Sequence, residues 1–454
     1  MRAEQLPKRL MIVGGILLLL YTFTVSHVDC NTITTWAYDL LGSIGNGSLR
    51  EYPIFTYEAH NMATNYTLFS NVVNAIWLLP VYLIDSLFHI GLSMTFYDVW
   101  YKVLILLACL LTLFLTERLL GNLGYSTYKK CICLFTLATS SILLISVIGK
   151  GQIDIFDMLF VILSMHLYLD ERIELSFLCL GVGCLFKPFL LLLGLPYFFL
   201  MVRRCRYRSF INAICMTLPY ILNLIITSLI MPEYFEMSEI TSEEFKKLYK
   251  MTRLEEFFHI RFNYIYVFLA LAIIICAICL YISLEGKTDN FRLIFYPTIM
   301  FMAFAIFVVP DALYWFIVVM PLFVIMGINL RRITDFLTLN FLINLSVSLL
   351  VLFLDKTFIP GKSFSAIGVL SHNMDIYSYI EDIEILGYAR GVLTTLFIVC
   401  MLLLCTLYFY EKKNGDKLTP YNDEGTSIVK ANTAPVYIQV IPALCYLVFS
   451  YIVS

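Results

Sequence analysis

Long apolar runs alternate with short polar segments along the whole chain. Many of the runs approach the roughly 20 residues that an α-helix needs to cross the hydrocarbon core of a bilayer. They predict about thirteen membrane-spanning helices, at residues 9–25, 98–117, 131–148, 153–169, 173–186, 188–202, 210–230, 263–283, 291–309, 312–328, 335–354, 387–410 and 436–453. We therefore expect an all-α polytopic membrane protein in which residues 1–454 form a single integral membrane domain.

A further apolar run at about 66–90 decides the sidedness of the chain. If this run spans the membrane, the basic loops fall alternately on both sides, whereas a juxtamembrane helical segment in the outer leaflet makes all of them cytoplasmic. We adopt the second topology. The basic residues that it places together are Arg2, Lys8, Arg9, Arg118, Lys129, Lys130, Arg172, Arg203, Arg204, Arg206, Arg208, Lys287, Arg292, Arg331, Arg332, Lys412, Lys413 and Lys417. Three long segments, 26–97, 231–262 and 355–386, then face the outside, and the middle one has the pattern of an amphipathic surface helix.

Composition agrees with a membrane location and excludes several other classes. Hydrophobic residues make up 60% of the chain and charged residues 14%, against roughly 45 to 50% and about 25% in soluble domains. The net charge of −2 gives no reason to expect a nucleic-acid partner. Most of the 13 Cys lie in apolar runs without neighbouring His or carboxylates, so no metal site is predicted, and only Cys30 is expected in a water-facing loop. Zinc-protease, Walker and serine-hydrolase motifs are absent from plausible positions.

Asp39 is the first candidate for chemistry. It follows the first expected span, among aromatic residues that are typical of a membrane interface. A partly desolvated carboxylate at the bilayer surface has a raised proton affinity and suits general-base work on a hydroxyl group. Alternatively, Asp39 caps a short juxtamembrane helix. Tyr38 and Glu51 in the same segment are candidate substrate contacts.

The second candidate is a polar turn between two expected spans, from Gly149 to Asp157, that contains Lys150 and Gln152 as candidate substrate contacts. Asp154 and Asp157 are three residues apart and share a helical face, so one can bind substrate hydroxyls while the other supports it. An acid at the start of a helix also interacts favourably with the helix dipole, which is a sufficient structural explanation for one of the two.

Two further sites are expected on the same side of the membrane. Lys187, followed by Pro188, interrupts an apolar run, and a lysine there is costly unless an anion or a cavity receives it. Alternatively, its side chain extends to the outer interface. Asp311, Tyr314 and Trp315 open another span from outside, where interfacial anchoring explains the aromatic residues, although sugar rings also stack on aromatic faces. All four residues are candidate substrate contacts.

The order of these motifs resembles the GT-C superfamily of membrane glycosyltransferases, which use polyprenyl-phosphate sugars, and within it glycosyltransferase family 87, a mannosyltransferase-like group. The resemblance covers roughly residues 10–200. It rests on an early Asp in a long outer segment, an aromatic-Pro run, a Gly-Gln-x-Asp turn at 151–154 and Gly-x-Gly-x-x-x-Lys-Pro at 181–188. It implies a GT-C-like bundle with a catalytic module at about 10–230 and variable C-terminal helices at about 263–454.

The resemblance also implies roles for individual residues. Asp39 becomes the catalytic base, Asp154 a second acidic catalytic residue and Lys187 a contact for the lipid-linked phosphate. The implied reaction transfers a hexose such as mannose, with inversion, from a polyprenyl-phosphate donor to a lipid-linked or glycan acceptor, with no cofactor and no divalent metal expected. Asn65-Tyr-Thr-Leu stands where Tyr-Pro-Pro is common in the family, which leaves the acceptor open.

Two other functions fit the sequence. A transporter or flippase would place ionisable groups near the middle of the membrane and on both sides of a cavity. A lipid-linked glycan polymerase or ligase would use outward Arg and His residues, here Arg50, Arg253, Arg261 and His372. Short loops and the absence of a retention signal favour a bacterial plasma membrane, with a retained first helix and the active site on the outer face.

Overall fold

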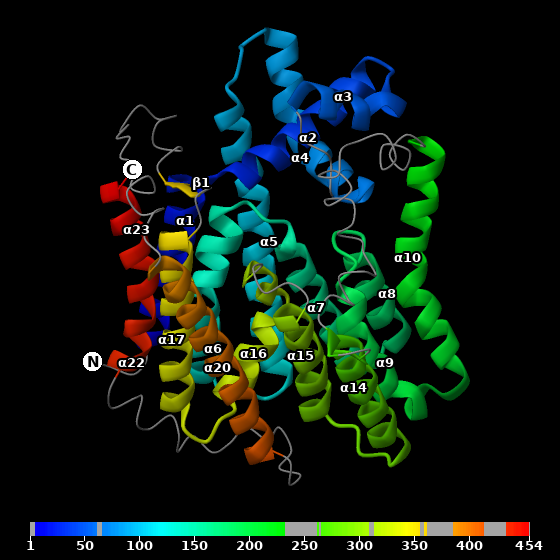
Figure 1. Ribbon diagram of the computed structural model, residues 1–454, viewed down its shortest axis with the longest axis vertical. Helices are drawn as coiled ribbons and strands as arrows, with labels where there is room; N and C mark the ends of the chain where they lie inside the picture. The colour runs from blue at the N-terminus through cyan, green and yellow to red at the C-terminus, as the bar shows by residue number, and fades with distance from the viewer. Residues whose placement is uncertain are drawn as a thin grey trace.

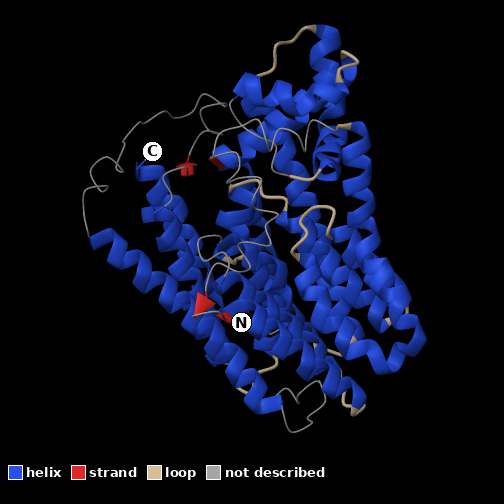
Figure 2. Ribbon diagram, turned by 45° about the vertical axis from the view of Figure 1, so that its right-hand side comes forward, coloured by secondary structure: helices blue, strands red, loops and turns tan. Residues whose placement is uncertain are grey.

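The computed structural model describes residues 5–60, 66–231, 261–262, 265–307, 313–354, 358–360, 385–412 and 433–453. Almost all of this part of the chain is α-helical (Figures 1 and 2). The expectation of an all-α polytopic membrane protein is confirmed, apart from two short pairs of strands. Most of the predicted surface helix at 231–262 and most of the outer segment 355–386 lie outside the described residues.

The helices of the first half include those of the expected apolar runs, and further helices lie in the segment 26–65 and in the turn at 206–208. They are α1 (Gln5–Thr24), α2 (Val28–Gly45), η1 (Leu49–Glu51), α3 (Tyr52–His60), α4 (Leu68–Phe88), α5 (Met94–Asn122), α6 (Thr127–Ala138), the π-helix η2 (Ile142–Gly149), α7 (Asp154–Leu169), α8 (Ile173–Gly183), α9 (Leu190–Cys205), η3 (Arg206–Arg208) and α10 (Ser209–Ile230).

The second half continues the same pattern. Its helices are α14 (Val267–Leu284), α15 (Asn290–Phe307), η5 (Leu313–Val319), α16 (Met320–Ile328), α17 (Ile333–Leu354), α20 (Ile385–Lys412), α22 (Ala434–Tyr437), η6 (Ile438–Val440) and α23 (Ile441–Val453). Strand β1 (Val25–His27) pairs antiparallel with β4 (Phe358–Pro360), with Val25 opposite Pro360. Strand β2 (Arg261–Phe262) pairs with β3 (Ile265–Tyr266).

Every expected span coincides with one helix or with adjoining helices, but fewer of them are long enough to cross a bilayer. Eight helical stretches in the described part have the length and apolar composition of a span, or nine if α6 and η2, which meet at a 47° bend, count as one. This criterion counts α9 and α10 as one stretch, Leu190–Ile230, and leaves out the shorter apolar helices, so the estimate of about thirteen spans stays a prediction. Helix α16 is apolar because protein surrounds it, and every one of its residues is buried, whereas α8 exposes Leu175 and Leu178. Helix α4 is one of the eight, so its length permits a crossing, and its juxtamembrane placement stays a prediction.

The two ends of the bundle differ in charge. Arg204 pairs with Glu171 and Arg208 with Glu174, while the Arg203 guanidinium donates to the Leu284 carbonyl. These contacts bring the α7–α8, α9–α10 and α14–α15 turns to one end, the lower end in Figure 1, whereas α2 and α3 lie at the upper end. Three of the basic turns therefore lie at one end, in agreement with the predicted topology, whose sidedness stays a prediction.

A buried lysine joins α1 to α5. Lys102 of α5 is 1% exposed, and its ammonium donates to the carbonyl of Tyr21 in the last turn of α1, at 3.1 Å, and to that of Val25, the first residue after α1. It thereby satisfies carbonyl groups that a helix leaves unpaired at its C-terminus.

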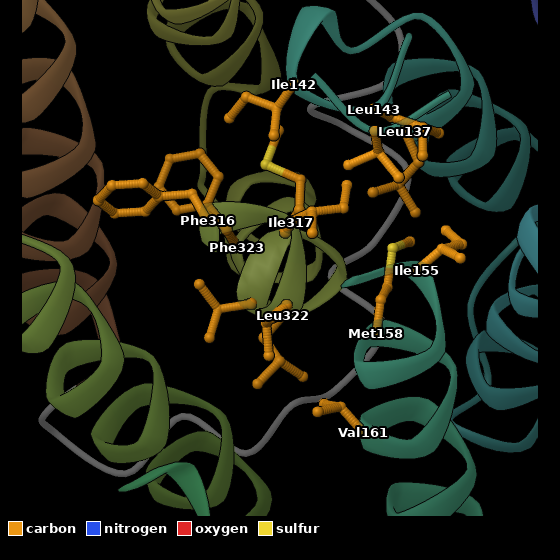
Figure 3. Packing of buried hydrophobic residues seen from close by; sticks show 14 of the residues in the cluster. Leu137, Ile142, Leu143, Ile155, Met158, Val161, Phe316, Ile317, Leu322 and Phe323 are labelled. Atoms are coloured by element: carbon orange, nitrogen blue, oxygen red, sulfur yellow. The ribbon is translucent and has the colours of Figure 1, made fainter. Parts of the chain in front are cut away.

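Packing of apolar side chains fixes the position of α7. Ile155, Met158 and Val161 of this helix meet side chains of α6, η2, η5 and α16 in the buried cluster shown in Figure 3. The hydrophobic effect contributes little to the association of helices in lipid. Close van der Waals packing of this kind is therefore the main interaction that holds such helices together. The acids of α7 are therefore carried on a helix that is held on several sides.

Candidate active site

Asp39 lies in the middle of α2, at the upper end of the bundle in Figure 1. The helix starts at Val28 because the His27 side chain accepts a hydrogen bond from the Asp29 amide at 3.0 Å. The interpretation of Asp39 as a helix cap is therefore wrong. Its carboxylate is 8% exposed, and the Oδ2 atom lies 3.2 Å from Nε2 of His60, the last residue of α3. Burial raises the pKa of Asp39, and the His60 imidazole opposes that shift.

Tyr38 and Glu51 occupy different surroundings. The Tyr38 ring meets Tyr82 and Tyr97 edge to face, with ring centroids 5.1 and 5.2 Å apart. Glu51 ends η1 and is exposed. Tyr38 therefore helps to hold α2 against α4 and α5, and a substrate contact for either residue stays a prediction.

The polar turn before α7 is docked against α2 and α5. Gly151 has φ +66°, and a Cβ atom at this position would lie 2.8 Å from Sγ of Cys30. Its carbonyl accepts a hydrogen bond from the Tyr101 hydroxyl at 3.0 Å. Cys30 itself is fully buried in the first turn of α2, so its expected place in a water-facing loop is wrong. Lys150, in the same turn, is also buried.

Gln152 connects this turn to two other elements through its side-chain amide. Its Nε2 donates to Oδ2 of Asp29 at 2.6 Å, and its Oε1 accepts from the Tyr66 hydroxyl at 2.9 Å. The amide is thus held in one orientation. In the structure Gln152 positions Tyr66, and its predicted substrate contact is untested.

Lys187 and Asp154 form a buried ion pair. The ammonium donates to both carboxylate oxygens of Asp154, at 2.8 and 2.9 Å, and the two side chains are 8% and 1% exposed. The rings of Tyr66 and Trp315 lie on the same ammonium, each with its centroid 5.5 Å from Nζ. Lys187 therefore does not extend to the interface. Four segments that are distant in sequence meet at this one cation.

The glycines of the Gly-x-Gly-x-x-x-Lys-Pro motif serve packing. A Cβ atom at Gly181 would lie 2.5 Å from the Cys215 carbonyl oxygen of α10, and one at Gly183 would lie 2.4 Å from Leu190. The two glycines let α8 approach α10 and the start of α9. This close packing sets the direction of the segment that carries Lys187.

Asp157 lies one turn further along α7 and is 1% exposed. Neither carboxyl oxygen has a hydrogen-bond partner among the residues that the structure describes. Its role as a substrate contact stays a prediction. Asp311 lies outside the described residues, as does the side chain of Tyr314, whereas Trp315 is buried beside Lys187.

Asp39 and the ion pair lie at the same end of the molecule and are joined by aromatic contacts. Trp36, one turn before Asp39 on α2, meets Tyr66 edge to face with centroids 5.5 Å apart. Tyr66 in turn covers Lys187. The ionisable side chains singled out on α2 and α7 thus belong to one polar region, which we call the upper site: Asp39, His60, Tyr66, Gln152, Asp154, Lys187 and Trp315.

Sequence reasoning missed His60 and the Tyr66 side chain as members of this region, and Asp29 as the partner of Gln152. His60 follows Thr56 by four residues, which places both on one face of α3, and this spacing was the available signal. Among the described residues, no group of three or more His, Cys, Asp or Glu side chains could hold a metal ion.

Comparison with known proteins adds little to this geometry. No family model matches the sequence, and no curated protein matches it. Among solved structures, the chain is similar to ArnT from Cupriavidus metallidurans bound to undecaprenyl phosphate. The sequence identity is 10% and the TM-score 0.42, over 97% of this chain and 75% of that one. These values are too low to establish a shared family, so the function must be argued from the residues themselves.

Proposed function

We propose that the protein is a GT-C-like glycosyltransferase that transfers a hexose from a polyprenyl-phosphate donor at the non-cytoplasmic face. The observation that carries the proposal is the buried Asp154–Lys187 pair, set between two aromatic rings at the end of the molecule that also holds Asp39. The basic turns at the opposite end make that end cytoplasmic by the positive-inside rule. The upper site then faces outward.

The residues divide the chemistry between them. Asp39 removes the proton of an acceptor hydroxyl while its oxygen attacks the anomeric carbon of the donor, and the sugar–phosphate bond breaks on the opposite side with inversion. The polyprenyl phosphate leaves with the electron pair, and the Lys187 ammonium stabilises its negative charge. The raised pKa of Asp39 makes its carboxylate a better proton acceptor than an exposed one.

Asp154 acts on this reaction through Lys187. Its bidentate hydrogen bonds keep the ammonium charged and fix its position in a region that otherwise disfavours charge. The Tyr66 hydroxyl is held by Gln152, and the Tyr66 ring covers one side of the Lys187 ammonium. In this proposal Asp154 is a positioning residue, which refines the catalytic role that the resemblance implies.

The test uses the isosteric substitution Asp39→Asn. We expect sugar transfer from a polyprenyl-phosphate hexose to fall by about 10²- to 10⁴-fold, the usual contribution of a general base, while insertion and purification remain normal. Glu58→Gln is the matched control, because Glu58 is an exposed acid on the neighbouring helix α3. Transfer is followed by mass spectrometry of lipid-linked glycans in cells that carry each variant or lack the protein. Full activity of Asp39→Asn would refute the mechanism.

A further inference from the structure

Helix α4 carries two buried amides whose hydrogen bonds are not met by the protein. Asn74 is 0% exposed, and neither its Oδ1 nor its Nδ2 has a partner among the described residues. Asn71, three residues earlier, is 1% exposed, and its Oδ1 is likewise unpartnered within the described ranges. Native proteins leave few buried amides unsatisfied, so a pair on one helix face calls for an explanation.

Helix α4, which carries these amides, contacts both parts of the upper site. At its start, the hydroxyls of Thr67 and Ser70 donate to the carbonyls of Leu185 and Phe186, the two residues before Lys187. Further along, α4 packs against α2, the helix of Asp39. The amides therefore lie on the part of α4 that runs from the Lys187 turn towards α2.

A third unpartnered group comes from α2. Trp36 is 3% exposed, and its indole Nε1 has no hydrogen-bond partner in the described part of the chain. Its ring contacts Tyr66, which covers Lys187, and it lies one turn before Asp39. All three groups are uncharged. They offer both donors and acceptors, as a hydroxyl does, so they suit a neutral polyol better than an anion.

We propose that Asn71 and Asn74 bind hydroxyl groups of the sugar that is transferred. This inference rests on the proposed function, since the transferred sugar must lie between the base that activates the acceptor and the cation that receives the leaving phosphate. Helix α4, which carries the amides, contacts both the segment before Lys187 and the helix of Asp39. A site built on paired amides discriminates sugars by the direction of their hydroxyls, because a misplaced hydroxyl leaves a buried amide unpaired.

The experiment separates sugar recognition from phosphate recognition. Two lipids are added to the purified full-length protein: undecaprenyl phosphate without sugar, and the polyprenyl-phosphate hexose that the wild type transfers, chosen from the mannose, glucose and galactose forms. We expect the sugar-bearing lipid to raise the thermal unfolding midpoint of the wild type more than the bare lipid does. In Asn74→Leu this difference should vanish, with the effect of the bare lipid retained and the KM for the donor raised about tenfold or more.

Two further variants keep the result interpretable. Asn74→Ala removes the amide without added bulk, in case leucine does not fit. Asn340→Leu is the matched control, because its buried amide donates to Gln439 at 2.8 Å. We expect Asn340→Leu to lower the unfolding midpoint without changing the difference between the two lipids, whereas Asn74→Leu should not lower the midpoint in the absence of lipid.

The outcomes distinguish the two proposals. A wild type that transfers sugar, together with an Asn74→Leu variant that keeps the difference between the lipids and the donor KM, would overturn the sugar site alone. The sugar site is also overturned if Asn74→Leu loses stability without lipid while its donor KM is unchanged, since the amide then serves a structural water. A wild type that transfers no sugar from any of the three donors would overturn the proposed function itself.

Discussion

The loss of stability on breaking the Asp154–Lys187 pair measures most directly how well the upper site excludes water. Lys187→Met removes the cation and leaves a carboxylate that is 1% exposed without its counterion. Removing one partner of a buried ion pair costs about 3–5 kcal/mol, most of it from the uncompensated charge that remains. We expect the free energy of unfolding of Lys187→Met to fall by that amount.

The double variant Asp154→Leu/Lys187→Met tests the cause of this loss. Replacing both members of a buried pair by apolar side chains of similar size is often neutral or stabilising. The double variant should therefore regain most of the stability lost in the single one, while sugar transfer stays lost because the phosphate contact is gone. Denaturant titration in detergent micelles measures all three proteins.

An exposed pair in the same protein supplies the control. Arg208 and Glu174 lie 3.2 Å apart, but their side chains are 58% and 36% exposed, so water screens the contact. Arg208→Met should therefore cost far less stability than Lys187→Met. If Lys187→Met costs no more than this control, water reaches the Asp154 carboxylate, and the argument from burial is refuted.

Two other changes test individual contacts. His60→Leu removes the imidazole that lowers the pKa of Asp39, so the pKa of Asp39 should rise further. The acid limb of the rate–pH profile for sugar transfer should then move to higher pH. An unmoved acid limb would show that His60 does not act on Asp39. Gly151→Ala should lower the unfolding free energy by about 1–3 kcal/mol, because the new Cβ would meet Cys30 at 2.8 Å at a residue with φ +66°. The control Gly47→Ala has a similar φ of +70° and nothing within 4 Å of its Cβ, so it should cost less, and equal losses at the two glycines would contradict the packing argument.

The helices were predictable because apolar side chains must cover a helix wherever it meets lipid or protein. Hydropathy could not show whether a given apolar helix is surrounded by lipid or by protein. Helix α16 reads as a membrane span but is buried on all sides, and α8 is only 11 residues long. Cys30 shows the opposite error: polar neighbours indicated a loop, whereas the close approach of Gly151 buries its side chain.

The site was predictable as a set of unusual residues and not as a set of contacts. Asp39, Asp154 and Lys187 stood out because charge is rare in apolar surroundings. The partners of these charges come from other elements: His60 ends α3, Tyr66 precedes α4 and Trp315 lies in η5. Such pairings depend on how helices distant in sequence meet, which hydropathy does not encode. Asn71 and Asn74 were overlooked because an amide in an apolar run carries no charge.

The contact between Lys102 and the end of α1 bears on how the chain is made. A lysine at the centre of a lone helix costs about 2.5–3.5 kcal/mol on translocon insertion scales. Here the Tyr21 carbonyl of α1 and the Val25 carbonyl just beyond its end accept hydrogen bonds from the Lys102 ammonium. The contact therefore offsets part of this insertion cost once α1 and α5 lie side by side in the membrane.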